Sequence, residues 1–446
     1  MKRIISLLIA LTLAFAMVPA MAEDAPIKVM LDGRYIEFDV EPRLINDRTM
    51  VPVRAIFEAL GANVDWDDAT WTVLSDKGET KVTLAINDKM LYKNGVGVEL
   101  DVPAQLVNSR TLVPIRAISE AYGCWVDWNN ELNTVIIVSD LSTTEVMNVN
   151  SQSVSAGYFN YCMYNMELIF AQSMGLSVEQ VEQSWNTSLG DVSLGKYVVD
   201  MTTENISIIK AAKANAKQKK IELTDEELKN IDNQIATFKA ELGNDEEVFK
   251  TVLDLIGTTE KDIAQYLNDI AVMDKLYAKY SDELGMDEKQ IKAYLDKNYI
   301  QAQHVLISTQ GLSDKEKAQK KELAEQVYEF ARQGMDFEKL VATYGEDPGM
   351  VYSPEGYLFT KGEMVKEFED IAFNLKVGKI SGVVETQYGY HIIKRVENQY
   401  DKEIYNQIRT MLVEDSVQSM FSSLKDGARI HINTGYVSNV APASVQ

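Results

Sequence analysis

The chain has 446 residues, of which 25% are charged and 46% hydrophobic, and this is the composition of ordinary globular domains. A chain of this length is expected to hold roughly three domains. Its formal net charge of −23 disfavours nucleic acid and anionic membranes as partners. The two cysteines, Cys124 and Cys162, lie in regions that we expect to be different domains, so we expect no disulfide. There is no CxxC pair that would indicate a zinc site.

Residues 1–22 have the pattern of an export signal peptide. Lys2 and Arg3 precede an apolar run, residues 4–18, which is too short to be a good membrane span, and the sequence A-M-A at 20–22 fits a cleavage site. Cleavage there would leave Glu23 as the first mature residue and change the net charge from −23 to −25, because both lost charges are positive. Because no cysteine follows the cleavage site, we expect no lipid anchor. Because the segment has the pattern of an export signal, we expect an extracytoplasmic location.

The first third of the chain contains an internal repeat at an offset of 62 residues. The sequences LINDRTMVPVRAIFEALGANVDW (44–66) and LVNSRTLVPIRAISEAYGCWVDW (106–128) align without gaps. Pro52 and Pro114 suit the entry of a short helix, and Gly61 and Gly123 suit its C-terminal end. Each copy is therefore predicted to be a small α+β module.

The repeated RT(M/L)VP(V/I)RAI motif resembles the copper amine oxidase N-terminal-like domain of Gram-positive surface proteins, over about residues 27–139. This region has no histidine, whereas copper prefers imidazole ligands, so we expect no copper site. The resemblance implies a stalk or a module that contacts the cell envelope. We expect Arg54 and Arg116 to bond to the neighbouring loop rather than to a ligand.

After a polar linker at 139–151, helical periodicity continues to about residue 298 and returns at 403–424. The clearest helix is ELTDEELKNIDNQIATFKAELG, where Thr224 and Glu227 form a capping box and Leu223 with Leu228 forms a hydrophobic staple. The basic run 210–220 predicts a solvated helix face, with a binding patch as the alternative. The stretch 158–174, rich in aromatic residues and Met, predicts core, with an adaptable surface for apolar clients as the alternative.

A compact unit at 301–398 has the predicted order β-α-α-β-α-β-β around a mixed sheet. The chain has three histidines, and two of them, His304 and His391, stand in short apolar strands of this unit. A lone histidine in such a strand is more often structural than catalytic. The third, His431, has no comparable context and is expected to be structural.

The runs FTKGEMVKEFEDIAFNLKVGKIS (359–381), TQYGYHIIK (386–394) and QAQHVLI (301–307) resemble parvulin-type peptidyl-prolyl isomerases over about 95 residues. The resemblance implies that His304 and His391 are the paired active-site histidines of that family. It places Asp347 beside the substrate carbonyl, and Thr386 and Tyr388 at polar positions that support the histidine pair. It gives the proline pocket as Met364, Phe368 and Phe359, with Leu358 as the alternative to Phe359.

Isomerisation of an X–Pro bond must cross a barrier of roughly 18–20 kcal/mol because amide resonance is broken. The reaction needs no covalent intermediate, and we expect no metal and no cofactor. The loop 350–355 lacks the glycine-rich run usual in the family, so a holdase with a weak or inert isomerase domain is the alternative. No basic cluster precedes the catalytic turn, which argues against specificity for phosphorylated substrates.

The predicted fold class is multidomain α+β: a signal peptide (1–22), the repeat domain (23–140), a mostly helical chaperone domain (150–298, completed by 400–435) and an inserted parvulin-like domain (299–398). This order is similar to that of the secreted foldases PrsA and SurA, although the repeats belong to neither. The implied function is a foldase outside the cytoplasm of a Gram-positive bacterium. Its partners would be unfolded secreted polypeptides with X–Pro bonds, and cell-wall components through the repeats. A third reading, a cell-surface binding protein, leaves the parvulin motifs unexplained.

Overall fold

The structure is a computed structural model that describes residues 26–129 and 132–440, so the expected export signal lies outside the described residues. The chain forms two compact units. One is built from the residues up to Lys279 together with the segment from Ser419 onward, and the other from Tyr280–Gln418. Both units contain helices and sheets, and the protein is a multidomain α+β protein. Within the described residues, no helix has the length and apolarity needed to cross a membrane.

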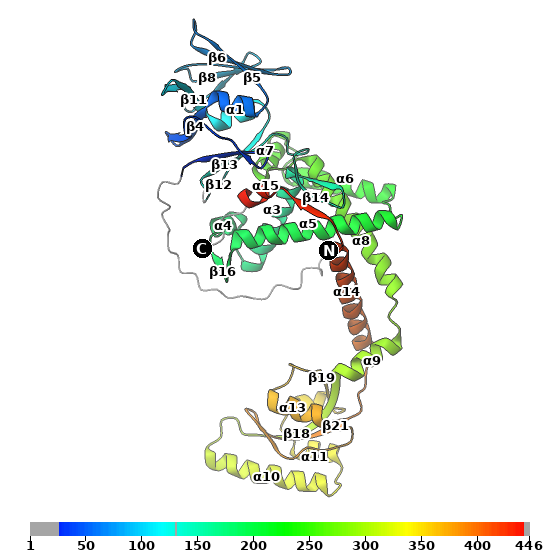
Figure 1. The fold of residues 1–446 in the computed structure, drawn as a ribbon. Helices are drawn as coiled ribbons and strands as arrows, with labels where there is room; N and C mark the ends of the chain where they lie inside the picture. Colours follow the sequence, from blue (N-terminus) through cyan, green and yellow to red (C-terminus); the bar gives the residue numbers. More distant parts are fainter. Residues whose placement is uncertain (1–25, 130–131, 441–446) are drawn as a thin grey trace. The chain divides into compact units, whose positions relative to one another are not determined.

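The two sequence copies fold into the same elements (Figure 1). The first copy contains β3 (Arg43–Ile45), β4 (Arg48–Pro52), α1 (Val53–Ala59), β5 (Asn63–Asp67) and β6 (Thr72–Lys77). The second contains β10 (Gln105–Val107), β11 (Arg110–Pro114), α2 (Ile115–Ala121), β12 (Trp125–Asn129) and β13 (Thr134–Val138). Pro52 and Pro114 are the N-caps of α1 and α2, and Gly61 and Gly123 follow the C-caps with φ of 75° and 80°. The expected module is therefore present twice.

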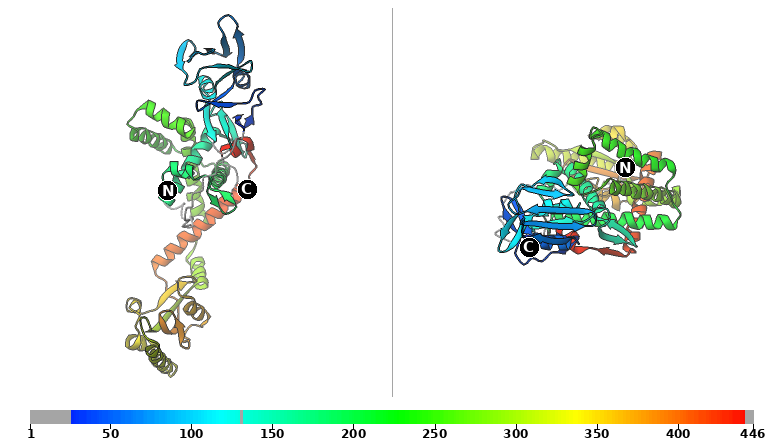
Figure 2. Two further views of the ribbon diagram at one scale, coloured as in Figure 1. Left: turned by 90° about the vertical axis from the view of Figure 1, so that its left-hand side faces the viewer. Right: turned by 90° about the horizontal axis from the view of Figure 1, so that it is seen from above.

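The structural repeat is longer than the motif and includes an opening hairpin. These hairpins are β1 (Lys28–Leu31) with β2 (Arg34–Tyr35), and β8 (Met90–Lys93) with β9 (Val96–Glu99). The first hairpin joins the sheet of the second copy, in the order β12-β13-β1-β2. The second joins the sheet of the first copy through β7 (Thr80–Ala85), in the order β5-β6-β7-β8-β9, whose strands lie side by side in Figure 2. Each copy thus completes its sheet with a hairpin from the other.

A pseudo-two-fold axis relates the two copies. β4 pairs with β11 in antiparallel register, and the central pair is Val51 with Val113, which are equivalent at the offset of 62. The ion pairs across the axis are reciprocal. Arg48 Nε donates to Asp101 Oδ2 over 2.7 Å, and the equivalent Arg110 Nε donates to Asp39 Oδ2 over 2.6 Å.

The expected bonds of Arg54 and Arg116 to a neighbouring loop are wrong. Their side chains are 61% and 58% exposed, and each lies 3.7–3.8 Å from the glutamate one helical turn later, Glu58 or Glu120. They point along the surface of a short helix and not toward a loop. The bonds between copies come instead from the arginine that opens each RT motif, Arg48 and Arg110.

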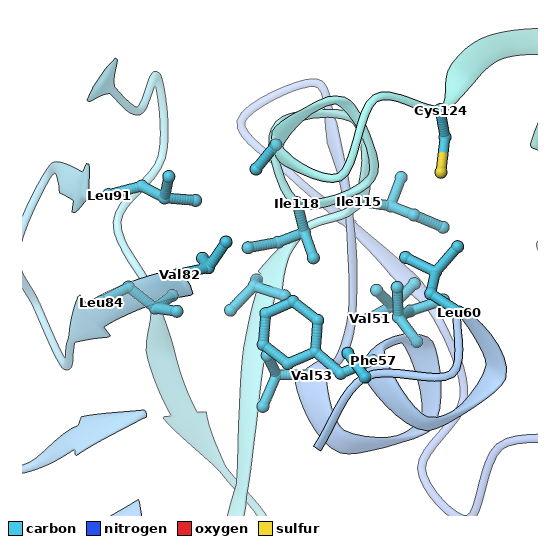
Figure 3. Packing of buried hydrophobic residues seen from close by; sticks show 14 of the residues in the cluster. Val51, Val53, Phe57, Leu60, Val82, Leu84, Leu91, Ile115, Ile118 and Cys124 are labelled. Atoms are coloured by element: carbon cyan, nitrogen blue, oxygen red, sulfur yellow. The ribbon is translucent and has the colours of Figure 1, made fainter. Parts of the chain in front are cut away.

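One hydrophobic core serves both copies. Figure 3 shows Phe57 of α1 and Ile118 of α2 converging on one interior, with Val82 and Leu84 of β7 facing them. All four side chains are at most 1% exposed. Because residues from both copies fill the same core, the pair is one cooperative domain rather than two modules in series.

The helical part of this unit begins with a sheet, where we expected a polar linker. Its elements are β14 (Glu145–Val149), β15 (Gln152–Ser155), α3 (Ala156–Met174), α4 (Val178–Gln183), β16 (Ser188–Leu189), β17 (Val192–Ser193), α5 (Leu194–Gln218), α6 (Asp225–Glu241), α7 (Glu246–Ile256) and α8 (Glu260–Leu284). Val146, Met147 and Val149 of β14 are buried, and they do not alternate strictly with polar residues, so the sequence pattern did not indicate a strand. The C-terminal β22 (Ile430–Ile432) pairs with β14, and α15 (Thr434–Val440) follows it.

Burial along the helices corrects one expectation. The basic run on α5 is not a fully solvated face: Lys210 is 1% exposed and its Nζ lies 2.6 Å from the buried Asp269 Oδ2. The capping box of α6 is present, and Ile231 and Ile235 are buried, whereas Leu228 is 42% exposed. Tyr158, Phe159, Cys162 and Phe170 of α3 are buried, as the core interpretation predicts. Both cysteines are buried free thiols.

The second unit centres on a four-stranded sheet. Its elements are α9 (Glu288–Asn298), β18 (Tyr299–Ser308), α10 (Asp314–Arg332), α11 (Phe337–Tyr344), α12 (Gly349–Tyr352), β19 (Tyr357–Thr360), α13 (Lys366–Asn374), β20 (Val384–Thr386), β21 (Gly389–Val396) and α14 (Lys402–Asp426). The order is β19-β18-β21-β20 and every pair of neighbours is antiparallel, so the predicted mixed sheet is wrong.

Strand alternation gives this sheet two buried faces. Val305, Ile307 and Ile392 pack against α10 and α11. Ala302, Phe359 and Ile393 face the other way and pack against α13. Figure 1 shows α13 on one side of β18 and β21, with α10 and α11 on the other. The candidate site lies on the α13 face.

The two ends of the segment 299–398 lie together. Asn398 Nδ2 donates to Tyr299 O over 2.9 Å, and the Gln399 N–H donates to Gln301 Oε1 over 2.6 Å. Beside this junction, Ile291 and Leu295 of α9 pack with Ile408 of α14. The sheet and its helices therefore close between two adjacent chain ends.

Candidate active site

The two histidines of the sheet meet on its α13 face. His304 stands on β18 and His391 on β21, and the register pairs His304 with Ile393 and Leu306 with His391, so the histidines are diagonal neighbours. His304 is 4% exposed and His391 is 5% exposed, so both are buried. The ring centroids are 5.2 Å apart with planes at 64°. The two histidines that the family resemblance pairs are therefore neighbours in the fold.

A carboxylate lies beside the first histidine. His304 Nε2 is 3.0 Å from Asp347 Oδ2, and the Tyr357 hydroxyl donates to the same oxygen over 2.8 Å. The Gly349 N–H donates to Asp347 Oδ1 over 3.0 Å. These donors, His304 foremost, hold the pKa of Asp347 well below its usual range, so the group is a carboxylate. Burial and then Asp347 raise the pKa of Tyr357, which therefore stays a donor.

A hydroxyl lies beside the second histidine. Thr386 Oγ1 is 2.9 Å from His391 Nε2 and accepts the Tyr388 N–H over 3.1 Å. Thr386 Oγ1 and His391 Nε2 are therefore hydrogen-bond partners, and the tautomer of the ring sets which of the two donates. Burial first, and then His304, lower the pKa of His391 to about 4. His391 is therefore neutral at ordinary pH.

The partners that orient the rings differ from our expectation. We expected each histidine to fix the tautomer of the other, but Asp347 and Thr386 are the polar groups at hydrogen-bonding distance from their Nε2 atoms. Tyr388 contributes through its backbone N–H, while its side chain is 42% exposed. His431 lies on β22, opposite Asn148, in the other unit.

An apolar wall adjoins the histidines. The Phe368 ring centroid is 5.3 Å from that of His304, 5.4 Å from that of His391 and 5.9 Å from that of Phe359. Met364 packs against the same cluster. It precedes α13, which begins at Lys366, so Met364 and Phe368 do not stand one turn apart on one helix, as we expected. Leu358 pairs with Gln301, so it faces away from Phe359, and Phe359 is the residue beside Phe368.

The unusual loop 350–355 is anchored to the sheet. Gln303 Nε2 donates to Pro354 O over 2.7 Å, and Gln301 Nε2 donates to Gly356 O over 3.2 Å. Gly356 has a φ of 102°, and a Cβ there would lie 2.7 Å from the Ala302 backbone, so only glycine fits this close approach. The changed sequence therefore keeps Asp347 and Tyr357 in place.

Sequence reasoning missed Tyr357. Its hydroxyl donates to Asp347, and its ring centroid lies 5.7 Å from that of His304. The signal was present, since Tyr357 and Phe359 alternate along one strand and both face α13. No group of three or more His, Cys, Asp or Glu side chains suited to a metal occurs in the part of the chain that the structure describes.

Comparison with known families agrees with this geometry. Residues 288–399 match the PPIC-type PPIASE domain, and residues 30–137 match the copper amine oxidase N-terminal domain. The chain thus contains a parvulin-type peptidyl-prolyl isomerase domain and, before it, a repeat domain of the copper amine oxidase N-terminal type.

Among individual proteins, the chain is similar to foldase protein PrsA of Geobacillus sp. (strain WCH70), with 36% identity over 30% of this chain and 46% of that protein. It is 30% identical to foldase protein PrsA of Halalkalibacterium halodurans over 46% of this chain and 61% of that protein. The chain therefore spans about half the length of these relatives. A crystal structure of the peptidylprolyl isomerase PrsA from Bacillus cereus is 26% identical and covers 54% of this chain and 88% of that one, with a TM-score of 0.27.

Proposed function

We propose that this protein is a peptidyl-prolyl cis-trans isomerase and foldase that acts on unphosphorylated X–Pro bonds. The observation that carries the proposal is the contact of an apolar wall, Phe368 with Phe359, with a buried polar pair, His304 and His391. The apolar wall suits the proline ring of a substrate, and the polar pair suits its polarised imide. The match to the PPIC-type domain supports the same assignment.

The mechanism follows from what the reaction must break. Twisting the imide removes resonance, so the proline ring must be held while the carbonyl rotates. In this proposal Met364, Phe359 and Phe368 hold the ring. Asp347 lies at the rim, where its fixed negative charge faces the carbonyl carbon as conjugation is lost. No bond to the protein forms.

The histidines support this arrangement rather than exchange protons with substrate. His391 is neutral and shares a hydrogen bond with Thr386, while His304 stands beside Asp347. Between them they keep Phe368 and Asp347 at fixed positions on the two sides of the substrate. Tyr388 assists through the backbone N–H that holds Thr386.

The test is an exchange assay on an unphosphorylated X–Pro peptide by NMR, with the full chain. Wild type should accelerate exchange, and Phe368→Ala and Met364→Ala should each lower kcat/KM about tenfold or more, because the grip on proline is lost. His431→Ala, the matched control outside the site, should change nothing. Wild-type exchange equal to the uncatalysed rate would leave the holdase alternative.

We further propose that the protein works outside the cytoplasm of a Gram-positive bacterium on unfolded secreted polypeptides, with the repeats contacting cell-wall components. The support is the similarity to PrsA foldases and the export-signal pattern at 1–22. Mass spectrometry of the protein from its host should find Glu23 as the first residue and no acyl group. Sedimentation with purified cell walls tests the envelope contact, and recovery of residues 1–22 would contradict the location.

A further inference from the structure

Two cavities in the repeat domain are copies of each other. We call the smaller one groove A, with a volume of about 780 Å³, lined among others by Pro52, Arg54, Trp66, Trp71 and Arg110. The larger, groove B, has about 1020 Å³ and is lined at the equivalent positions by Pro114, Arg116, Trp128, Asn133 and Arg48. Each groove takes its arginine of the RT motif from the other copy. The hairpin exchange and the pseudo-two-fold axis therefore build the same concave surface twice.

The grooves differ at one conspicuous position. Trp71 of groove A has a φ of 53°, and the equivalent Asn133 of groove B has a φ of 48°. Asparagine tolerates this left-handed conformation, whereas a bulky side chain adopts it at a cost on the order of 1 kcal/mol or more. Trp71 is also 55% exposed, so burial does not offset the strain.

The turn before Trp71 is held rigid. Asp67 accepts the Ala69 N–H at Oδ1 over 2.9 Å and the Thr70 hydroxyl at Oδ2 over 2.6 Å. A fixed backbone therefore holds the Trp71 indole at the surface. Trp66, in the same groove, has its indole N–H occupied by Asp68 Oδ1 at 2.7 Å, which leaves its ring as a contact surface.

The charge of groove A restricts the ligand. Five carboxylates and two guanidinium groups line it, a formal net charge of −3, so polyanions are repelled. Arg110 is bonded to Asp39, so donor and acceptor groups stand side by side. Hydroxyl groups, which both donate and accept, suit such pairs, and the C–H face of a pyranose ring suits an exposed indole.

We propose that groove A binds a neutral, hydroxyl-rich polysaccharide with a sugar ring stacked on Trp71, and that groove B is a second, weaker site for the same polymer. A repeating ligand matches a repeated site, because two linked sites share one chain and gain avidity. This names the ligand class for the proposed envelope contact and rests on that contact, but not on the isomerase activity.

The experiment titrates the full chain with chitotetraose and with cellotetraose, followed by calorimetry and by tryptophan fluorescence. Wild type should bind at least one of them, and Trp71→Asn should weaken binding at least fivefold. The same variant should melt at an equal or higher temperature, because asparagine already occupies the equivalent backbone at Asn133. Tyr92→Asn, an aromatic that is 41% exposed on the same domain but outside both grooves, should leave affinity unchanged.

The opposite results are equally clear. Failure of wild type to bind either sugar, or an unchanged affinity in Trp71→Asn, overturns the proposal. Tighter binding of tetralysine than of either sugar would assign the groove to cationic peptides instead. The two proposals can fail separately. If wild type binds neither sugar but Trp71→Asn still sediments with cell walls, the envelope contact stands and only the groove is rejected.

Discussion

At the scale of single residues, the site depends on two polar contacts to buried imidazoles. His304 is beside Asp347, and His391 is beside Thr386. Each contact places a polar partner within 3.0 Å of a ring nitrogen that water does not reach, since both residues are at most 5% exposed. Removing one partner therefore leaves a buried polar atom unsatisfied, which costs more than the bond itself contributes.

Thr386→Val should lower both activity and stability. The valine keeps the shape but leaves His391 Nε2 without its hydrogen-bond partner, at a cost of roughly 1–3 kcal/mol. We expect a reduced kcat/KM, a lower urea midpoint and a changed tautomer signature of His391 in the nitrogen NMR spectrum. Thr386→Ser, which restores the hydroxyl, should recover all three. A normal tautomer in the valine variant would show that Thr386 does not orient the ring.

The pH dependence of folding follows from His391. Its pKa is about 4 in the folded chain against 6.5 for a free side chain, so between these values the unfolded chain binds a proton that the folded chain does not. Stability should therefore be complete above pH 6.5 and fall as pH drops toward 4, by on the order of 3 kcal/mol. The lowered pKa of Asp347 acts below this window, as pH falls through its usual range and beneath.

Thermal unfolding at pH 7, 6, 5 and 4.5 measures this loss. A His391→Gln variant should start lower but lose less over the same range, because it has no proton to take up at this position. Equal slopes for the two proteins would assign the loss to other groups. The exchange rate of the X–Pro peptide should stay flat from pH 6 to 8, where both His391 and Asp347 keep one charge state.

At the scale of elements, the short helix α12 adjoins the site through Gly349, whose N–H donates to Asp347. Met350 is buried and anchors it, while Val351 and Tyr352 are 77% and 86% exposed directly after the Gly349 N–H that Asp347 accepts. The loop that departs from the parvulin pattern thus carries two exposed apolar side chains on the helix that begins beside Asp347.

Tyr352→Ser should raise KM about fivefold for peptides with aromatic or branched residues next to proline, because an apolar contact with the substrate is lost. It should leave kcat and the melting temperature unchanged, since the side chain supports nothing in the fold. Met335→Ser, an apolar residue that is 48% exposed in the turn between α10 and α11, is the control. Equal loss for alanine-flanked peptides would mean that Tyr352 acts on the pocket itself.

Prediction from the sequence worked best where one local signal determines the structure. The capping box of Thr224 with Glu227 marks a real helix start, and the two strand histidines do meet. It failed where distant partners decide. Lys210 is buried because it pairs with Asp269, which is 59 residues away in the sequence. β14 lies in the middle of its sheet because β22, from the far end of the chain, pairs with the edge that the adjacent β15 leaves open. The exchange of hairpins has no sequence signal except the repeat itself.

At the scale of the whole molecule, the segment 299–398 behaves as an insertion with adjacent ends. Deleting it and joining Asn298 to Gln399 should leave a folded, helical protein, because Ile291 and Leu295 keep their contact with Ile408. We expect this deletion to retain suppression of client aggregation and to lose isomerase activity. Collapse of the helical circular dichroism signal would show that the insert is needed for the rest to fold.

Removing residues 400–446 should have the opposite effect. It takes away β22, leaving an edge of β14 unpaired, and it takes away Tyr436, which is fully buried and whose hydroxyl donates to Asn160 Oδ1 over 2.8 Å. We expect the truncated chain to aggregate. Tyr436→Ala, which tests the contact alone, should lower the free energy of unfolding by roughly 3–5 kcal/mol, against no change for His431→Ala. A soluble truncated chain with an unchanged melting temperature would refute the expectation that residues 400–435 complete the helical domain 150–298.

The hairpin exchange between the two repeats also constrains their ancestry. A single copy would present β1 and β2 with no strand to join and leave its own sheet short of an edge hairpin, since each sheet is completed from the other copy. Such a chain satisfies both needs by pairing with an identical chain, as a symmetric swapped dimer. A tandem duplication would turn that two-fold axis into the internal one seen here. Once fused, the copies would be free to diverge. They differ in β7, which lies between β6 and the hairpin in one sheet while β13 pairs directly with β1 in the other, and in the tryptophan or asparagine at positions 71 and 133.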